Sequence, residues 1–236
     1  MEINLNGNNI TGTLNYAFAG AGVSKLSGNG TVNQVDVNTP LASFNQGAGV
    51  TITTLNLINV APATYTNNGT ITTANITDTD ARFLNQGTAT VSTLNVNTTG
   101  FVTLGGNAPI TQVVVANAGS VDIAPGTTVT GLVVNGSTTV NNAGVITDLV
   151  ANEDVIVTGT PVENEPTGNG NVSADEDELL GKQALTAFLK TASNFEYSVE
   201  NGIPTVGNYK DLSTLTISGL NVTIDISLNC NIKLAT

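Results

Sequence analysis

The most regular feature of this sequence is a six-residue pattern: an apolar residue, two others, an apolar residue, one other and a further apolar residue. Its copies begin at Val32, Ile52, Ile71, Val91, Ile110, Val129 and Ile146. Subtracting successive numbers gives spacings of 20, 19, 20, 19, 19 and 17 residues. A unit this short cannot bury its own apolar face, so the period predicts that neighbouring units stack on one another.

Each unit also has a second apolar position about a dozen residues later, at Phe44, Tyr65, Phe83, Val102, Val121 and Val140. Glycine returns before the next copy, at Gly30, Gly49, Gly69, Gly87, Gly126 and Gly144, where a tight corner needs its permissive φ. About 19 residues at roughly 3.3 Å each make roughly 60 Å of chain, enough to circle a narrow core once. Because parallel crossovers are nearly always right-handed, we expect an all-β, right-handed parallel β-helix, a β-solenoid with coils of about 19 residues.

Residues at the same place in successive coils should form columns with a spacing of about 4.8 Å. The predicted interior column contains Val35, Leu55, Ala74, Leu94, Val113, Leu132 and Leu149. A predicted hydroxyl column contains Thr53, Thr72, Ser92, Thr111, Thr130 and Thr147, and a predicted amide ladder contains Asn56, Asn75 and Asn95. We expect the members of each polar column to satisfy one another's hydrogen bonds. The amide ladder should stop before the first coil, where Asp36 takes its place.

The strand pattern is interrupted after Gly159, where prolines and glycines follow. We divide the chain into β-helix coils with an irregular N-terminal cap (residues 1–160), an inserted or capping module (residues 161–211) and closing β-strands (residues 212–236). Near the N-terminus, Leu14 and Tyr16 fit inner positions of an early coil. The apolar segment 17–23 is expected to help cover the first coil.

The inserted module near the C-terminal end is predicted to contain one helix and one hairpin. Ser173 and Glu176 have capping-box spacing, and apolar residues then recur at three- and four-residue steps, which predicts a helix over 173–193. Asn201 and Gly202, between alternating apolar segments, predict the hairpin turn. Closing strands are predicted at 212–217 and 222–228.

We expect residues 161–211, rather than the faces of the coils, to carry any specific recognition. The segment combines a helix that could cover the end of the solenoid with an acidic start and three aromatic residues, Phe195, Tyr197 and Tyr209. Solenoid ends expose strand edges and need such a cover. The alternative is that these aromatic side chains only pack beneath the cap.

Charge and residue usage exclude several classes of function. Six Lys and Arg against 18 Asp and Glu give a net charge of −12, which disfavours nucleic acid and anionic membrane surfaces as partners. Without histidine, and with Cys230 as the single cysteine, the chain lacks the commonest general base, the commonest zinc ligand and an internal disulfide. No apolar run approaches the roughly 18 residues of a membrane-spanning helix. We expect no cofactor.

Few residues are candidates for chemistry. Asp78 and Asp80, with Arg82 beside them, are the nearest pair of carboxylates within the repeats, and such a pair could cleave a glycosidic bond. A solvated turn explains them with fewer assumptions. The run Asp175 to Glu178 could bind a hard cation, but the start of a helix explains it more simply. We therefore predict a non-enzyme without catalytic, cofactor-binding or metal residues, and the ligand-binding residues stay unknown.

Threonine arrays raise two binding hypotheses. Regular hydroxyl arrays on solenoids can order water and bind ice, and Thr51-Ile52-Thr53 and Thr88-Ala89-Thr90 have the Thr-x-Thr spacing that this needs. Other coils interrupt the array with Gln112, Gly131 and Asp148. Carbohydrate binding ranks above ice binding, although the tyrosine and tryptophan that would stack on sugars are scarce.

The repeats over residues 30 to 160, with copies such as ITTLNL and VSTLNV and corners GTIT and GTAT, resemble the Thr/Asn/Val-rich β-helical repeats of large bacterial cell-surface proteins, including some that carry surface-layer homology modules. The resemblance implies an extracellular or cell-surface rod with a structural or adhesive role. Its expected partners are a cell-surface protein or polysaccharide, or further copies of the chain. No surface-layer homology module, sortase signal or calcium-binding nonapeptide occurs in the sequence, so neither anchoring nor calcium dependence is implied.

Overall fold

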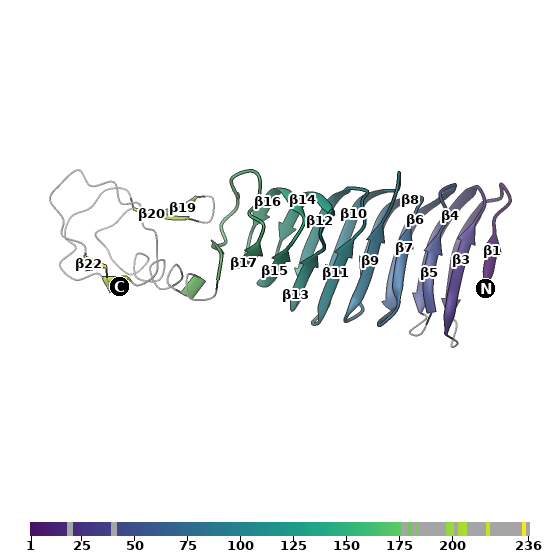
Figure 1. The fold of residues 1–236 in the computed structure, drawn as a ribbon, viewed down its shortest axis with the longest axis horizontal. Coiled ribbons are helices and arrows are strands. Elements are labelled where there is room, and N and C mark those ends of the chain that lie inside the picture. Colours follow the sequence, from purple (N-terminus) through teal and green to yellow (C-terminus); the bar gives the residue numbers. More distant parts are fainter. Residues whose placement is uncertain are drawn as a thin grey trace.

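The computed structural model describes residues 1–17, 21–38, 42–175, 179–180, 183, 197–200, 203–206, 216–217 and 233–234. Up to residue 159, consecutive strands alternate between two long sheets, so that each coil contributes one strand to each sheet (Figure 1). Neighbouring strands within both sheets are parallel. The predicted parallel β-solenoid is confirmed. Among the described residues, no helix has the length and apolarity needed to cross a bilayer.

Sheet A has ten strands. In spatial order they are β1 (Glu2–Asn4), β3 (Gly22–Ser27), β5 (Ala42–Gln46), β7 (Thr64–Asn67), β9 (Ala81–Asn85), β11 (Phe101–Gly105), β13 (Ser120–Ile123), β15 (Thr138–Asn142), β17 (Val155–Gly159) and β18 (Val172–Ser173). Sheet B has eight strands. They are β2 (Ile10–Ala17), β4 (Gly30–Asn38), β6 (Val50–Asn59), β8 (Thr70–Ile76), β10 (Thr90–Asn97), β12 (Ile110–Asn117), β14 (Thr128–Val134) and β16 (Val145–Ala151). The β-branched Val, Ile and Thr that dominate these segments fit a pleated, half-buried surface.

The predicted interior column runs along sheet B. Each of its seven residues is at most 1% exposed. Strand pairing aligns every member with the next, in the order Val35, Leu55, Ala74, Leu94, Val113, Leu132 and Leu149. The column is therefore confirmed as predicted, and it forms one wall of a single hydrophobic core.

The second apolar positions of the units lie on sheet A and fall into two columns. Phe83 pairs with Leu104, whereas Val102 pairs with Ala81. Both β9 and β11 have more than one inward position, because side chains alternate along a strand. Phe83 lies one inward position further along its strand than Val102 does along the next. Within one column Phe44 pairs with Tyr65 and Tyr65 with Phe83, and within the other Val102 pairs with Val121 and Val121 with Val140.

Aromatic rings fill the core of the early coils. Tyr16 meets Phe44 edge to face with ring centroids 4.7 Å apart. Phe44, Tyr65 and Phe83 then stack nearly parallel at 5.2 and 5.6 Å. Beyond Phe83 the same column continues with smaller side chains, namely Leu104, Ile123 and Asn142. Each aromatic pair contributes about 0.5–1.5 kcal/mol beyond the burial of its surface.

The N-terminal coil follows the prediction only in part. Leu14 pairs with Val35 and Tyr16 with Val37, which confirms the inner positions expected of them. Val23 lies in β3 with 58% of its surface exposed, so at this residue the expectation that segment 17–23 covers the first coil is wrong. Residues 18–20 of that segment lie outside the described residues.

After β17 the chain crosses the end of sheet B. The amide of Glu163 donates to the carbonyl of Ile146 at 2.9 Å, and that of Gly170 donates to the carbonyl of Ala151 at 2.8 Å. The chain then returns to sheet A as β18. Strand pairing thus continues beyond residue 160, and this segment covers the final edge of sheet B.

The capping box predicted at Ser173 is wrong. Ser173 belongs to β18, and its buried hydroxyl has no hydrogen-bond partner. The pairing of β18 with β17 removes this residue from the helix start. Instead, the amide of Leu179 donates to the carbonyl of Asp175 at 3.1 Å, and Leu179, Leu180 and Gln183 are helical. The remaining residues between 176 and 196 lie outside the described part of the chain, and with them most of the predicted helix.

The predicted hairpin is confirmed. β19 (Tyr197–Glu200) pairs antiparallel with β20 (Ile203–Val206), and Glu200 lies opposite Ile203 across the predicted two-residue turn. Further on, β21 (Thr216–Ile217) pairs parallel with β22 (Lys233–Leu234). The predicted strand over 222–228 lies outside the described residues, as do Phe195, Tyr209 and Cys230.

Candidate binding surfaces

Most strands of sheet B bend once. Side chains alternate in direction along a strand, so two adjacent outward residues mark a bend. In β10, Ser92 and Thr93 both face outward between the buried residues Val91 and Leu94. β6, β8, β12 and β14 show the same break in alternation. Each of these coils therefore presents two narrow outward faces on sheet B, one before the bend and one after it.

The face before the bend is a two-column surface, which we call the threonine array. Its first column contains Thr31, Thr51, Thr70, Thr90, Pro109 and Thr128. Its second column contains Asn33, Thr53, Thr72, Ser92, Thr111 and Thr130. Pairing aligns Thr51 directly with Thr70, and Thr70 with Thr90. The flanking pairs likewise place Thr53 opposite Thr72, which confirms the position of the predicted hydroxyl column.

The hydroxyls of the array do not bond to one another. Within the described part of the chain, none of its threonine or serine hydroxyls forms a hydrogen bond to a protein atom. The expectation that the predicted hydroxyl column satisfies its own hydrogen bonds is therefore wrong. Its sixth member, Thr147, lies beyond the array and donates to Glu163 Oε2 at 2.9 Å rather than to a neighbour in the column. The side chains lie about 4.8 Å apart between coils, too far for a direct hydroxyl contact without a change of rotamer. Their hydrogen-bonding capacity faces solvent.

The residues expected to interrupt the array lie elsewhere. Gln112, Gly131 and Asp148 follow the bend, in register with Thr93 rather than with Ser92. The interruptions within the array are instead Asn33, Ser92 and Pro109. The repeat pattern alone does not show that these two adjacent outward columns lie on different faces.

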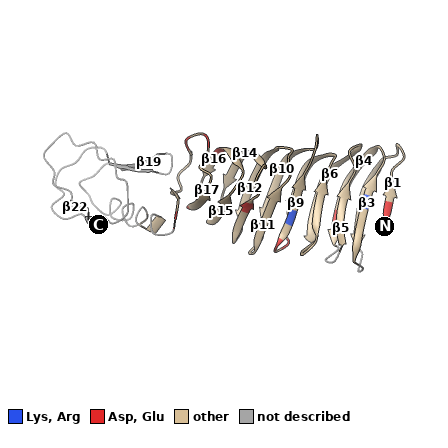
Figure 2. Cartoon of the chain, viewed as in Figure 1, with Lys and Arg blue, Asp and Glu red and all other residues tan. Residues whose placement is uncertain are grey.

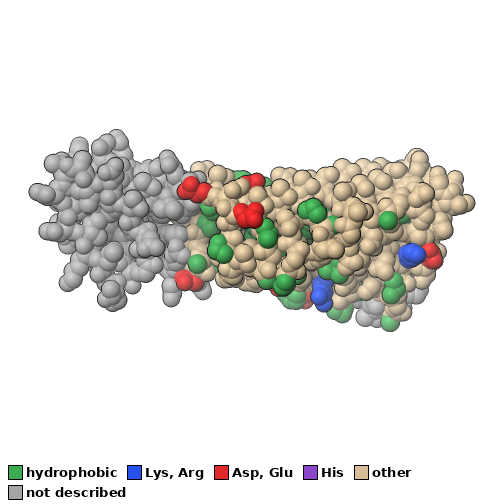
Figure 3. Space-filling view, turned by 45° about the horizontal axis from the view of Figure 1, so that its top comes forward, with side chains coloured by type: hydrophobic (Ala, Val, Ile, Leu, Met, Phe, Trp, Pro, Cys, Tyr) green, Lys and Arg blue, Asp and Glu red, His purple; other side chains and the backbone are tan. Residues whose placement is uncertain are grey.

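The array carries no charge. Strands β6, β8, β10, β12 and β14 contain no acidic or basic residue. Charged side chains are sparse along the whole solenoid, as Figure 2 shows. The face in Figure 3 shows apolar side chains as separate spots rather than one continuous patch. The surface of the coils is therefore mainly neutral and polar.

The amide ladder lies on the face after the bend. Asn95 Nδ2 donates to Asn75 Oδ1 at 2.9 Å, and Asn75 Nδ2 donates to Asn56 Oδ1 at 2.8 Å. Asn56 Nδ2 then donates to Asp36 Oδ1 at 2.7 Å, and the same oxygen accepts a bond from Gln34 Nε2 at 2.9 Å. The prediction that the ladder stops before Asp36 is wrong as a statement about hydrogen bonds, because a carboxylate oxygen accepts an amide N–H as an amide oxygen does.

Other polar chains also end on a carboxylate. Thr158 Oγ1 donates to Asn141 Oδ1 at 3.0 Å, and Asn141 Nδ2 donates to Asp122 Oδ1 at 2.6 Å. Asn164 Nδ2 donates to Asp148 Oδ1 at 2.7 Å. In each case the acceptor is the residue nearer the N-terminus, so these acidic side chains have a structural role as terminal acceptors.

Sequence analysis missed a row of buried amides at the corner after sheet A. Gln46, Asn67 and Asn85 are aligned and fully buried. Asn67 Nδ2 donates to Asn85 Oδ1 at 2.8 Å, and Asn67 Oδ1 accepts the amide of Gly69 at 2.9 Å. For Asn67 and Asn85 the available signal is an amide residue two positions before a corner glycine, but the many surface asparagines make this pattern hard to recognise. These amides satisfy the backbone groups that a tight corner leaves unpaired.

The described tyrosines of the coils are not free to stack on a sugar. Tyr65 is fully buried, and its hydroxyl donates to Gln46 Oε1 at 2.8 Å. Burial raises the pKa of Tyr65 well above its ordinary value. Tyr16 is also buried, so of the aromatic residues in the described coils Phe101 alone is largely exposed, at 45%.

The surroundings of Asp78 and Asp80, the candidate catalytic pair, indicate structural roles. Asp78 is nearly buried, and its Oδ2 accepts the backbone amides of Val60 and Ala61 from the preceding coil, the latter at 2.8 Å. Asp80 is exposed at a left-handed turn position with φ of 63°, and Arg82 is exposed on β9. The carboxylate of Asp78 thus holds a turn of the neighbouring coil in place.

The candidate cation site can be assessed only at its first residue. Asp175 is exposed and precedes the helical turn, while Glu176, Asp177 and Glu178 lie outside the described residues. In the part of the chain that the structure describes, no three acidic, histidine or cysteine residues come together as a metal site.

A polar groove crosses successive corners of the solenoid. It has a volume of about 480 Å³ and is lined by Asn68, Gln86, Gly87, Gly106, Asn107, Pro125 and Gly126. Asn107 Oδ1 accepts the amide of Gly87 at 2.7 Å, and Asn68 Nδ2 donates to the carbonyl of Gln46 at 3.0 Å. Among the described residues, the side-chain amide of Gln86 has no protein partner. Gly106 must be glycine, because it has φ of 107° and a side chain there would meet the Asn85 carbonyl.

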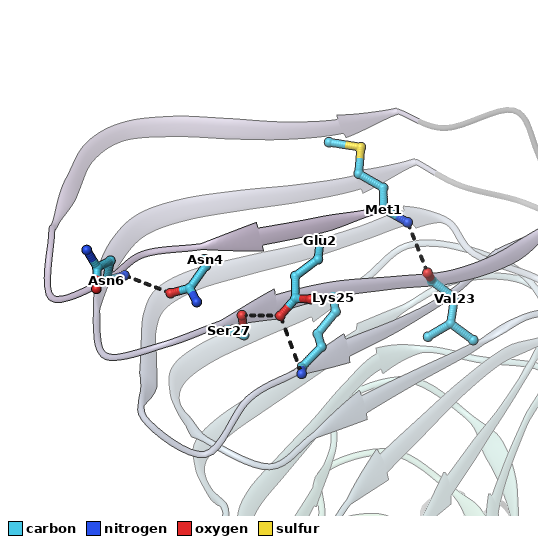
Figure 4. Close-up of polar contacts among 7 residues, drawn as sticks. All are labelled: Met1, Glu2, Asn4, Asn6, Val23, Lys25 and Ser27. Carbon is cyan, nitrogen blue, oxygen red and sulfur yellow. Dashed lines mark hydrogen bonds and ion pairs between the residues drawn. The ribbon is translucent and has the colours of Figure 1, made fainter.

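The first coil contains an ion pair. Lys25 Nζ lies 3.4 Å from Glu2 Oε1, and the hydroxyl of Ser27 donates to the same oxygen at 2.6 Å (Figure 4). The hydrogen bond from Ser27 and then the charge of Lys25 lower the pKa of Glu2 below its ordinary value of 4.5. These contacts attach β1 to β3.

No protein-family model matches this chain, and no curated protein or solved structure shows a significant match to it. Function must therefore be argued from the geometry of the coils and their surfaces.

Proposed function

We propose that the chain is a non-enzymatic structural or adhesive module of a bacterial surface protein, which acts outside the cell as a rigid β-helical rod. The observation that carries this proposal is the single hydrophobic cluster that extends from Leu5 near the first strand to Val155 in β17. Each coil packs on its neighbours through this shared core, so bending the solenoid requires separating close-packed layers. Such a core makes the module suitable as a rigid spacer.

Two further features support a surface role. The outer faces of the coils carry few charges, and some of their polar side chains are tied into chains such as the Asn95 to Asp36 ladder, which keeps long sheets soluble. The repeat motif also resembles that of bacterial cell-surface proteins. A catalytic role has less support, because Asp78 is already committed to two backbone amides.

Antibody labelling of the producing bacterium tests the location. We expect antibodies against the folded chain to label intact cells as strongly as permeabilised cells, while antibodies against a cytosolic protein label permeabilised cells alone. Labelling that requires permeabilisation would contradict an extracellular role.

Carbohydrate binding is the second candidate function, and the corner groove favours it. The groove offers glycine backbone and three amide side chains without charge, which suits the hydroxyls of a neutral sugar. Retention on insoluble polysaccharides is the test. Gln86→Ala should abolish retention if the groove binds sugar, whereas Gln112→Ala, an exposed amide outside the groove, should not. Retention of the original chain that is lost in Gln86→Ala would replace the pure spacer role with a glycan-binding one.

A further inference from the structure

We propose that the threonine array binds ice. The proposal goes beyond the rod function and rests on different residues. Its basis is the arrangement of two in-register columns of unpaired hydroxyls on one face of sheet B, from β4 to β14.

The array repeats in two directions. Neighbouring coils are about 4.8 Å apart, and residues two apart in a strand, such as Thr70 and Thr72, are about 6.6 Å apart. A surface with two fixed repeat distances is complementary to a partner that is itself periodic. Ice is itself periodic in two directions with spacings of similar size, so a layer of water ordered on the array can continue into its lattice.

The side chains are preorganised for such a layer. Threonine is β-branched, so its χ1 angle is restricted, and each methyl and hydroxyl is held in a preferred orientation. The residues beneath, such as Ile52, Ile71 and Val91, are fully buried and fix the backbone. Little conformational entropy is therefore lost when water orders on the array. The hydroxyls are able to donate hydrogen bonds to water and to accept them, because none of them is hydrogen-bonded to a protein atom.

Other partners fit this surface less well. A protein partner usually meets a cluster of aromatic or arginine side chains, and the array has neither. A nucleic acid needs cations, and β6 to β14 of sheet B have none. A crystalline polysaccharide is also periodic, but sugar faces are commonly bound by exposed aromatic rings, which the array lacks.

Slow freezing of a dilute solution of the full chain tests the proposal. The protein should be enriched in the growing ice and should shape the crystals. Thr72→Lys places a long charged side chain at the centre of the array and should reduce the enrichment to the level of an ordinary protein. Thr66→Lys, on the outward side of β7 in sheet A, is the matched control and should keep the enrichment. Circular dichroism and the thermal midpoint of each variant establish that both fold.

Three results would overturn the proposal. The first is exclusion of the original chain from ice. The second is an equal response of ice enrichment to Thr72→Lys and Thr66→Lys in folded variants. The third is retention on crystalline cellulose or chitin that Thr72→Lys abolishes, without any effect on ice, since this would assign the array to a polysaccharide.

Discussion

Asp36 Oδ1 accepts a hydrogen bond from Asn56 Nδ2 at 2.7 Å, and this bond ends a ladder that begins three coils away at Asn95. Each amide in the ladder donates toward the N-terminus, and Asn75 and Asn56 also accept from the following coil. Because hydrogen bonds in a chain polarise one another, a negative charge at the final acceptor strengthens the whole row. A carboxylate is thus better suited to this terminal position than a further amide.

Replacing Asp36 should expose this effect. Asp36→Ala leaves Asn56 and Gln34 without their acceptor and should lower the free energy of unfolding by about 1 kcal/mol. Asp36→Asn keeps an acceptor oxygen and should cost less. Urea unfolding of both variants measures the difference, and an Asp36→Asn variant as unstable as Asp36→Ala would contradict the argument.

The interior column predicts a severe effect at Leu94. Leu94→Ala should destabilise the chain by about 2–5 kcal/mol, since it leaves a cavity, and Leu94→Asp should prevent cooperative folding because it buries an unpaired charge. Ile58→Ala is the control, as Ile58 is 46% exposed and its loss should cost less than about 0.5 kcal/mol. Thermal unfolding followed by circular dichroism checks this; tolerance of Leu94→Asp would mean that the coil alignment is wrong.

Asp78 and Asp80 should behave as structural residues. Asp78→Ala removes a charged acceptor of two backbone amides and should cost about 1.5–3 kcal/mol in unfolding free energy. Asp80→Asn should be nearly neutral, because asparagine tolerates a left-handed φ. We also expect no release of reducing sugar from pectin, alginate or hyaluronan, with or without calcium. The variant Asp78→Asn keeps an acceptor oxygen. Release of reducing sugar by the original chain that is lost in this variant would support a catalytic role for Asp78.

The attachment of β1 should depend on pH through Glu2. Its lowered pKa means that the folded state favours the carboxylate, so the stabilisation is present above the ordinary pKa of 4.5 and is lost as pH falls through the lowered value. The amide of Leu5, which donates to the carbonyl of Ser27, reports on this attachment. After correction for intrinsic exchange, its hydrogen-exchange protection should fall across that window, and Glu2→Gln should abolish the fall. A Glu2→Gln variant with unchanged pH dependence would assign the effect to another carboxylate.

Register along sheet B could be predicted because the six-residue pattern keeps its length from coil to coil. Leu55, Leu94 and Leu132 therefore fell in one column without any knowledge of the corners. Along sheet A the distance from the pattern to the next strand varies, and its strands have more than one inward position. Phe83 and Val102 both face the core, so hydrophobicity alone could not show that they belong to different columns.

The surface was harder to predict than the core. A bend places Ser92 and Thr93 on different faces, and periodicity without coordinates does not reveal where alternation breaks. For that reason Gln112 was counted as an interruption of an array to which it does not belong. Likewise Asn67 and Asn85 look like surface asparagines in sequence, because burial of an amide depends on backbone partners supplied by neighbouring coils.

Beyond Phe83 the core side chains of this column change from aromatic to aliphatic. This change affects how such a chain can lengthen over evolutionary time. Tandem duplication adds whole coils, and a new coil survives only if its side chains fit those above and below. A second copy of the coil that contains Leu104 would meet Leu104 and Ile123, neighbours of nearly its own size. A second copy of the coil that contains Tyr65 would need another buried acceptor for its hydroxyl, because Gln46 already serves the first. A repeat is thus gained or lost more readily in the aliphatic half of this solenoid than at the coil that contains Tyr65.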